Sequence, residues 1–453
     1  MTSTYPLLRH QRPDARIGIY RGEAVKAGDF LRDVASLAAV LPAARHVINL
    51  CKDRYRFTVA FAAALMREQT SLLPPTDAPG VLGQLAADYS GAYCLHDAEQ
   101  AAEAPQVPLP SLAFSEKPAA GSGAVAVPSF AQDQPAVILF TSGSTGKPTP
   151  HLKSWGCVAR SALAAGTRLG VPGLAGATVI GTVPQQHSYG FESTVMLALQ
   201  HGLGIHGARP FYPGDIIDCI AASPRPRILV TTPVHLRALL ADASELPALD
   251  LIVSATAPLA PQLAGQAERR FRSPLLEIYG CSEAGQLAAR RTVANDAWHC
   301  LDGVALRQDS AGTWASGILV EGEVLLGDII ELSGPHRFIL HGRTADLVNI
   351  AGKRTSLAHL NYHLNSVPGV VDGVFIMPEE TGDATTRLMA FAVAPGLSSE
   401  TLLAALRERV DPIFLPRPLL LVEALPRNIV GKLPRDAIMR LAAGSAAASG
   451  TRR

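Results

Sequence analysis

Residues 137–148 read Val137-Ile138-Leu139-Phe140-Thr141-Ser142-Gly143-Ser144-Thr145-Gly146-Lys147-Pro148. Four apolar residues lead directly into glycines, hydroxyl side chains and a single lysine, and the apolar run predicts a buried strand. The loop after it suits phosphate, because glycine lets the main chain approach closely while amides, hydroxyls and the lysine donate to oxygen atoms. By composition alone such a loop is more often a plain flexible turn, and this alternative stands until the order of the residues is considered.

The loop differs from that of an ordinary P-loop ATPase. A Walker A loop requires Gly at the position of Thr141 and Ser or Thr at the position of Pro148. Both requirements fail, so the P-loop interpretation is excluded.

Apolar patterns on both sides of this stretch predict an α/β fold. Residues 29–41 and 57–66 have helical spacing, and further strand-like runs are separated by segments long enough for helices. This arrangement favours parallel βαβ packing. The predicted strands are 47–50, 137–140, 178–183, 228–232, 251–254 and 275–279.

The pattern changes after residue 321, where closely spaced strands are expected at 322–332 and 337–341. A domain boundary is therefore expected near residue 343. The remainder mixes strands with helices such as 401–410, whose apolar residues share one face and whose preceding serines suit the first turn as caps. We expect a large N-terminal domain (1–342) with mainly parallel sheets and a β-rich subdomain, a small C-terminal α+β domain (346–441), and a flexible tail (442–453).

The composition limits the classes of partner and the type of protein that can be expected. The 453 residues include 40 Lys and Arg against 39 Asp and Glu, a formal charge of +1 that favours neither nucleic acid nor an anionic membrane. Hydrophobic residues make up 48%, which is enough for a substantial core. Six cysteines lack metal or disulfide spacing, so reduced and mostly buried thiols are expected. No stretch suits a membrane span or a secretory signal, which predicts a cytoplasmic protein.

The order Thr-Ser-Gly-Ser-Thr-Gly-Lys-Pro resembles the signature loop of the adenylate-forming superfamily, which includes acyl-CoA synthetases, aryl-acid ligases, luciferases and adenylation domains of nonribosomal peptide synthesis. Further motifs similar to those of the family follow in its order as far as residue 436. They are 254–259 (adenine side), 279–283 (Tyr-Gly-x-Thr-Glu, with Ser282 for Thr), 327–328 (ribose), 342–354 (interdomain segment) and 426–435 (final lysine motif). The region before the phosphate loop is shorter than in many members, so acid and acceptor specificity are least predictable there.

The resemblance implies a role for each matching residue. Lys432, His187 and Glu283 are the expected catalytic residues, with Lys432 entering the adenylation site and His187 beside the acid carboxylate. Glu283 and Thr145 are the expected Mg²⁺ ligands. The expected nucleotide-binding residues are Thr141, Ser142, Gly143, Ser144, Thr145, Gly146, Lys147, Ala255, Thr256, Ala257, Pro258, Tyr279, Gly280, Ser282, Asp328, Arg343 and Arg354.

Three positions depart from the family pattern. Thr149 stands where a lysine is usual, Leu326 where a threonine is usual, and Ala345 in a hinge (343–345) that commonly holds Asp or Lys. The sequence leaves open whether Lys153 supplies the charge missing at position 149.

The implied reaction joins a carboxylic acid to a thiol in two steps. ATP and Mg²⁺ activate an aryl or fatty acid as acyl-AMP, and a phosphopantetheine thiol then accepts the acyl group while the small domain rotates. An acyl carrier protein is the favoured acceptor, and free CoA is the alternative. A second alternative, a catalytically weak nucleotide- or acyl-adenylate-binding protein, follows from the three departures. The oligomeric state is not predicted.

Overall fold

Residues 137–142 of the quoted stretch lie in one strand of a β-hairpin, and Pro148 begins the other, in a six-stranded sheet. We describe the protein from a computed structural model, which covers residues 3–74, 76–97, 110–113, 126–142, 148–241, 245–343, 347–350, 353–377, 388–427, 433–434 and 437–441. The sheet has the order β10-β9-β5-β4-β6-β7, parallel except for the edge strand β10. The chain therefore turns back into the sheet after the loop. The strands are β4 (His46–Asn49), β5 (Thr70–Leu73), β6 (Tyr93–His96), β7 (Ser111–Ala113), β9 (Pro135–Ser142) and β10 (Pro148–Ser154).

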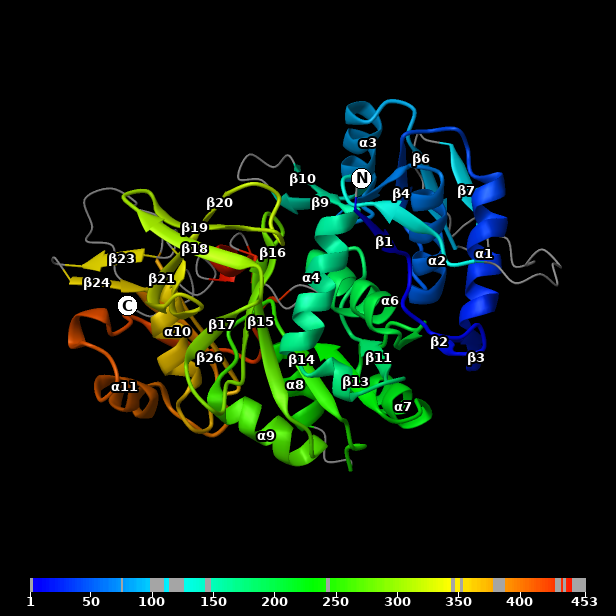
Figure 1. Ribbon diagram of the computed structural model, residues 1–453. Coiled ribbons are helices and arrows are strands. Elements are labelled where there is room, and N and C mark those ends of the chain that lie inside the picture. Colours follow the sequence, from blue (N-terminus) through cyan, green and yellow to red (C-terminus); the bar gives the residue numbers. More distant parts are fainter. Residues whose placement is uncertain are drawn as a thin grey trace.

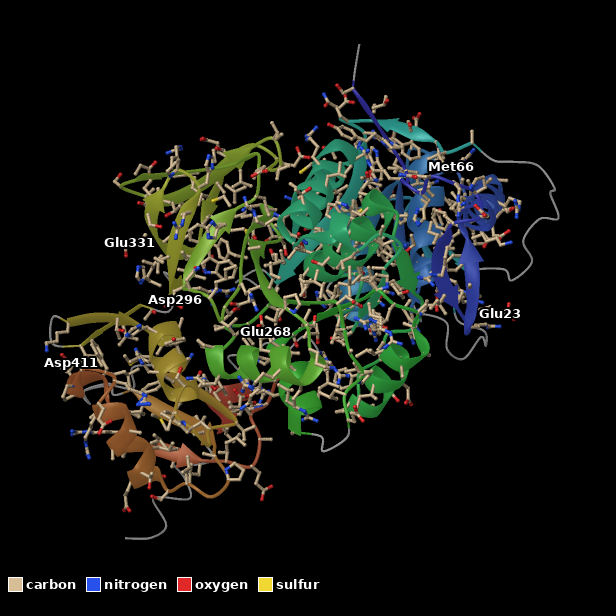
Figure 2. All side chains as sticks on the ribbon, turned by 60° about the horizontal axis from the view of Figure 1, so that its bottom comes forward. Glu23, Met66, Glu268, Asp296, Glu331 and Asp411 are labelled. Carbon is tan, nitrogen blue, oxygen red and sulfur yellow. The ribbon has the colours of Figure 1, made fainter. Side chains whose placement is uncertain are left out.

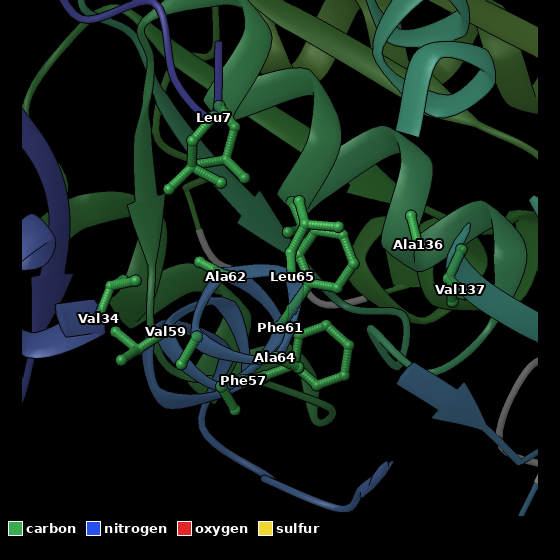
Figure 3. Close-up of a cluster of buried hydrophobic side chains, with 14 of the residues drawn as sticks. Leu7, Val34, Phe57, Val59, Phe61, Ala62, Ala64, Leu65, Ala136 and Val137 are labelled. Carbon is green, nitrogen blue, oxygen red and sulfur yellow. The ribbon is translucent and has the colours of Figure 1, made fainter. Parts of the chain in front are cut away.

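Three helices accompany this sheet: α1 (Ala27–Val40), α2 (Arg54–Met66) and α3 (Pro79–Asp88). Asp53 caps α2 by accepting from the Arg56 amide at 3.0 Å. All residues of α2 from 54 to 65 are buried, and Phe57 and Phe61 lie in the cluster of apolar side chains drawn in Figure 3. The two helices predicted before residue 70 are thus confirmed, each beginning two or three residues earlier than expected.

Helix α2 is also tied to the second, larger sheet. Arg54 is wholly buried, and its guanidinium donates to the carbonyls of Gly181, Val183, His206 and Ala208 at 2.9–3.2 Å. These carbonyls lie at or just beyond the ends of two neighbouring parallel strands, so Arg54 joins the two sheets at the carboxyl edge of the strands, where open α/β sheets generally bind ligands.

The larger sheet has eleven strands in the order β21-β22-β17-β16-β15-β14-β13-β11-β12-β2-β3. The run from β15 to β2 is parallel, and four of its strands, β11, β13, β14 and β15, match predicted ones, whereas β12 and β2 were not predicted. This confirms the expected parallel packing. The strands are β2 (Arg16–Tyr20), β3 (Glu23–Lys26), β11 (Thr178–Gly181), β12 (Gly204–His206), β13 (Arg227–Thr231), β14 (Leu251–Ser254) and β15 (Leu275–Cys281).

Several helices connect and cover these strands, and α7, α8 and α9 each begin with a proline, which suits the first helical position. Helix α4 begins after Ser154, whose hydroxyl accepts from the Cys157 amide. Residues 188–201 form one helical stretch with a π-helical turn, η3, in its middle. The helices are α4 (Trp155–Arg168), α5 (Ser188–Gly190), η3 (Phe191–Met196), α6 (Leu197–His201), α7 (Pro213–Ala222), α8 (Pro233–Ala241) and α9 (Pro261–Phe271), with a 3₁₀ turn η2 (Val171–Gly173).

The expected β-rich part follows as antiparallel strands that extend the large sheet, beside a separate three-stranded sheet. Two further short strands, β1 (Thr4–Pro6) and β8 (Ser129–Ala131), pair with each other. The antiparallel strands are β16 (Gly285–Arg290), β17 (Ala297–Cys300), β21 (Asp328–Gly334) and β22 (Arg337–Arg343), and the small sheet contains β18 (Val304–Asp309), β19 (Gly312–Gly317) and β20 (Val324–Leu326).

The C-terminal elements form a smaller α+β arrangement with its own apolar cluster, which includes Leu402, Leu406 and Val410 of the predicted helical face. Ser398 caps α11 by accepting from the Thr401 amide at 3.1 Å, as expected. The mixed α/β fold with large sheets is confirmed, whereas the domain limits stay a prediction. The elements are β23 (Leu347–Ile350), β24 (Lys353–Ser356), α10 (Leu357–Asn365), β25 (Asp372–Ile376), β26 (Met389–Val393), α11 (Ser399–Arg407), η5 (Pro412–Phe414) and β27 (Leu419–Leu421).

The N-terminal (blue) and C-terminal (orange) elements lie at opposite ends of the molecule, with α4 and the large sheet between them (Figure 1). One ion-pair triad joins the C-terminal elements to the large sheet's helices: Asp372 of β25 lies 3.7 Å from Arg237 of α8 and 2.6 Å from Arg427. Helix α10 also packs on β22, where the Ser356 hydroxyl donates to the His341 carbonyl.

The surface and the thiols agree with the composition. The labelled carboxylates of Glu23 and Glu331 lie at the outer surface on opposite sides of the molecule (Figure 2). Four of the six free cysteines are buried and two are partly buried, which confirms the predicted burial. Within the described part of the chain, no helix is both long and apolar enough to cross a membrane.

Candidate active site

Three of the expected nucleotide-binding residues meet at one corner of the large sheet. The hydroxyl of Tyr279, near the end of β15, donates to Asp328 Oδ2 at 2.7 Å. Arg343 is the strand partner of Asp328 across β21 and β22, and its Nε lies 3.8 Å from Asp328 Oδ1. Because Arg343 is 67% exposed and Asp328 20% exposed, both side chains can still reach a polar ligand such as a ribose.

Tyr279 is fixed by its surroundings. Its ring packs against Trp298 and Phe338, with centroids 5.7 and 5.4 Å away. Burial, followed by the nearby Asp328 carboxylate, raises the pKa of Tyr279 well above its ordinary value. The phenol therefore stays protonated and donates to Asp328 throughout the physiological pH range.

Glu283, the expected Mg²⁺ ligand, lies in the turn between β15 and β16, and its side chain is 40% exposed. His151 of β10 stands between this carboxylate and the phosphate loop. Its Nε2 lies 3.0 Å from Thr141 Oγ1 and 3.8 Å from Glu283 Oε1. The first residue of the loop and the carboxylate are thereby brought to the same place, although 142 positions separate them.

His151 is a residue that the sequence reasoning missed. The alternation of a strand would have placed it on the same face as Thr149 and Lys153, but the sequence alone does not show what that face contacts.

Lys153 answers the question left open by Thr149. Its side chain is buried, with 2% exposure, and Nζ donates to the main-chain carbonyl of Glu283 at 2.5 Å. The ammonium is therefore engaged with the Glu283 turn. It therefore lies in a different environment from the exposed position 149.

The expected adenine-side loop, residues 255–258, follows the buried strand β14 directly. Thr256 in this loop has φ +79°, a left-handed conformation that is strained for a β-branched residue. Strain of this kind clusters at binding sites, where surrounding structure maintains it. Ala255 is buried, whereas Pro258 is exposed at the loop surface.

Residues 184–190, here called the acid-side segment because they contain His187, lead into and include α5. His187 is the N-cap residue of this helix and is partly buried. The Tyr189 hydroxyl donates to the carbonyls of Thr231 and Val253 at 3.1 and 2.9 Å, so this tyrosine joins the ends of β13 and β14. The run 191–199 that follows is entirely buried and so belongs to the core.

Other expected residues are placed only in part. In the strand register, Ser142 of β9 is opposite Pro148 of β10, and Arg354 of β24 is opposite Asn349 of β23. Gly280 and Ser282 lie at the end of β15 and in the turn beside Glu283. Expected residues outside the described part of the chain are Gly143, Ser144, Thr145, Gly146, Lys147 and Lys432.

The donor set fits Mg²⁺ that is shared with a substrate. Glu283 offers carboxylate oxygen, a hard ligand, beside the start of the phosphate loop. Burial raises the pKa of the adjacent Cys281 thiol to about 12, so it remains neutral. Among the described residues, no three His, Cys, Asp or Glu side chains are grouped so as to hold a metal. A single carboxylate together with substrate phosphates is a usual way for proteins to hold Mg²⁺.

Comparison with known structures supports the fold. The ATP-bound MatB from Rhodopseudomonas palustris superposes with a TM-score of 0.79 at 19% identity, over 96% of this chain and 97% of that one. The O-succinylbenzoate coenzyme A synthetase (MenE) from Bacillus subtilis, in complex with ATP and magnesium ion, gives 0.77 at 19% identity, over 96% and 99%. Likeness at this identity concerns the fold alone.

Comparison of sequences reaches the family. A 4-coumarate–CoA ligase of Rhodobacter capsulatus is 29% identical over 274 residues, which are 60% of this chain and 67% of that protein. A 4-coumarate–CoA ligase of Halorhodospira halophila is 27% identical over 335 residues, 69% and 78% of the two chains. The family model described as AMP-binding enzyme matches residues 9–304. This chain therefore belongs to the AMP-binding family of adenylate-forming enzymes.

Proposed function

We propose that this protein is an AMP-forming acid–thiol ligase. It activates a carboxylic acid with ATP, releases pyrophosphate, and transfers the acyl group from acyl-AMP to a pantetheine thiol. The observation that carries the proposal is the meeting of Thr141, His151 and Glu283, because it joins the predicted phosphate loop to the predicted Mg²⁺ ligand.

The chain's own residues would bind and orient the reactants. Asp328, held by Tyr279 and flanked by Arg343, would accept from ribose hydroxyls. The loop 255–258 would take the adenine. The loop 141–147 would surround the phosphates, and Arg354 would face the site when the small domain closes. Stabilisation of charge by fixed donors dominates such phosphoryl chemistry.

Mg²⁺ held by Glu283 and Thr145 would neutralise charge on the phosphate oxygens. Lys432 would approach the acid carboxylate and the α-phosphate, and His187 would contact or gate the carboxylate. These two roles rest on the motifs in the sequence.

An aromatic acid is the proposed substrate. In addition to the 4-coumarate–CoA ligases, an indoleacetate–CoA ligase of Aromatoleum aromaticum and a hydroxybenzoate–CoA ligase of Thauera aromatica are similar to this chain, at 22% and 26% identity. Their names support an aryl acid over the fatty acid that the sequence left equally open.

Free CoA is the proposed acceptor, since the relatives are named as CoA ligases. An acyl carrier protein, which the sequence favoured, is the competing acceptor. Incubation of the acyl-adenylate-forming enzyme with CoA and, separately, with phosphopantetheinylated carrier proteins distinguishes the two by mass spectrometry of the thioester.

The small domain, 346–441, is proposed to rotate about the hinge 343–345 between the two half-reactions. Ala345 lacks the polar side chain usual at the hinge, so the rotation should persist with altered kinetics. Equal distances between the domains with ATP and acid, and with acyl-AMP and pantetheine, would argue against this.

Acid-dependent exchange of pyrophosphate into ATP tests the function. A panel of aryl and fatty acids should give exchange with at least one aryl acid, and Lys432→Ala should reduce it by roughly 100-fold or more while leaving ATP binding and folding intact. Lys26→Ala, at an exposed position of β3, is the control. ATP binding without exchange for any acid would instead favour the alternative of a catalytically weak binding protein.

A further inference from the structure

The turn that carries Glu283 is held from two sides by buried side chains. Lys153 donates through Nζ to the main-chain carbonyl of Glu283 at 2.5 Å. Glu192 Oε2 accepts from the main-chain amide of Gln286, just after the turn, at 3.1 Å. These contacts reach across 130 and 94 residues respectively. The turn therefore receives its position from β10 and from the π-helical turn η3.

Both side chains are almost fully buried, at 2% exposure for Lys153 and 5% for Glu192. They line one small cavity together with Cys157 and Ser161, and the Ser161 hydroxyl has no hydrogen-bond partner among the described residues. Burial of two charged groups is unfavourable unless each is compensated. Here the ammonium and the carboxylate share the cavity. The ammonium binds a main-chain carbonyl of the turn, and the carboxylate binds the main-chain amide of Gln286, the second residue of the strand β16 that follows the turn.

Glu192 also connects the turn to the acid-side segment. Its Oε1 accepts a hydrogen bond of 2.6 Å from the hydroxyl of Ser188, the residue that follows His187. The π-helical turn 191–196 brings this carboxylate to the segment, and such turns are frequent at functional sites. One carboxylate thus spans the predicted acid side and the predicted metal side.

Strand β10 contributes on one face only. His151 and Lys153 alternate with Leu152, which is 51% exposed, so the first two face the Glu283 turn while Leu152 faces away. His151 approaches the Glu283 carboxylate and Lys153 the Glu283 carbonyl, so side chain and main chain of the same residue are both contacted from this strand.

We propose that Lys153 and Glu192 are positioning residues, which fix the Glu283 turn so that its carboxylate is pre-placed for Mg²⁺-bound nucleotide. The inference rests on the proposed function of the site as a nucleotide site. It assigns Lys153 to the metal-ligand turn rather than to the phosphates. Groups that orient a metal ligand typically change metal affinity by 10- to 100-fold when removed.

Calorimetric titration with ATP, with and without Mg²⁺, tests the proposal. In Lys153→Met, the Kd for ATP in EDTA should stay within about twofold of wild type, whereas the tightening produced by Mg²⁺ should fall about tenfold. A phosphate-binding lysine would instead weaken ATP equally in both conditions, and this result would overturn the proposal. Lys26→Met, the same substitution at the exposed end of β3, is the matched control and should change neither Kd.

Removal of one buried charge also lowers the stability of the fold. Further variants therefore distinguish an effect on the position of the Glu283 turn from an effect on stability. Glu192→Gln keeps an oxygen that can accept from the Gln286 amide, and should lose less of the Mg²⁺ effect than Glu192→Ala. The double variant Lys153→Met, Glu192→Gln should recover thermal stability relative to Lys153→Met, because no uncompensated charge remains. Its Mg²⁺ effect should stay as reduced as in Lys153→Met. If the double variant recovered both its thermal stability and the full Mg²⁺ effect, Lys153 and Glu192 would serve only to stabilise the fold.

Failure of the proposed function is distinguishable in the same experiments. Wild-type protein that binds ATP with a normal Mg²⁺ effect but catalyses no exchange would contradict the ligase assignment and leave this inference standing. A normal Mg²⁺ effect in folded Lys153→Met would contradict the inference and leave the ligase assignment standing.

Discussion

His235 provides a prediction whose size can be calculated from the structure. This residue lies on α8 and is 4% exposed, with Nδ1 3.1 Å from Thr182 Oγ1 and 3.0 Å from Thr232 Oγ1. Its ring also packs against Phe211, with centroids 5.3 Å apart. Burial lowers the pKa of His235 from 6.5 to about 4, because a charged imidazole would lose its hydration.

The direction of the pH effect follows from the lowered pKa. The stabilisation is fully present above pH 6.5, the value of the unfolded chain, and is lost as pH falls from 6.5 towards 4. At pH 5.5, an ordinary histidine would be about 90% protonated, whereas folded His235 would be about 3% protonated. The folded protein is therefore about 1.3 kcal/mol less stable at pH 5.5 than at pH 7.5 through this residue alone.

The measurement is an NMR titration of protein labelled with ¹³C at the histidine rings. Loss of one signal in His235→Gln identifies His235 among the 13 histidines. That signal should remain at its neutral position down to about pH 5. In urea unfolding, His235→Gln should reduce the stability difference between pH 7.5 and 5.5 by about 1.3 kcal/mol, since glutamine keeps hydrogen bonding to the threonines but cannot be charged.

The control is His336→Gln, the same substitution at an exposed histidine. The pH dependence that His235→Gln removes should persist in this variant. A His235 signal that titrates with a midpoint above pH 6 would refute the reasoning, because burial would then fail to keep the imidazole neutral.

Two further substitutions test contacts at the site and between the regions. Tyr279→Phe removes a 2.7 Å hydrogen bond to the Asp328 carboxylate but keeps the ring packing, so the affinity for ATP measured by calorimetry should fall by up to about tenfold. An unchanged affinity would contradict the proposal that Tyr279 holds Asp328 for binding the ribose. Arg237→Gln weakens a 3.7 Å contact with Asp372, whose side chains are 18% and 13% exposed. A loss of about 1 kcal/mol should shift the populations of domain arrangements about fivefold, as read from spin-label distances between α8 and α11, and an identical distance distribution would argue that this contact does not hold the domains together.

Much of the fold could be predicted because apolar periodicity reports burial directly. The strands at 228–232 and 251–254 are found within one residue of their predicted limits, as β13 and β14. Limits of helices were less accurate: the helix predicted at 57–66 begins at Arg54, a residue whose charge favours a loop by pattern alone. Arg54 is buried only because four carbonyls from distant strands accept its hydrogen bonds.

The candidate site divides in the same way. Motif order identified Tyr279, Asp328 and Arg343, and the structure brings these three together. Their roles towards ATP, and those of Lys432 and the loop 143–147, stay predictions. His151 and Glu192 carried no signal of their own, because a histidine in a strand and a glutamate in an apolar run have no motif.

The sequence by itself determined the family, the alternation of strands and helices, and the type of residue available at each predicted ligand contact. Only the tertiary structure decided which of these residues touch. Lys153 illustrates the difference: its charge suggested a substitute for the lysine missing at position 149, but packing directs its ammonium to the Glu283 carbonyl, 130 residues away. Periodicity specifies the face on which a side chain lies, whereas strand order and register determine what lies opposite that face.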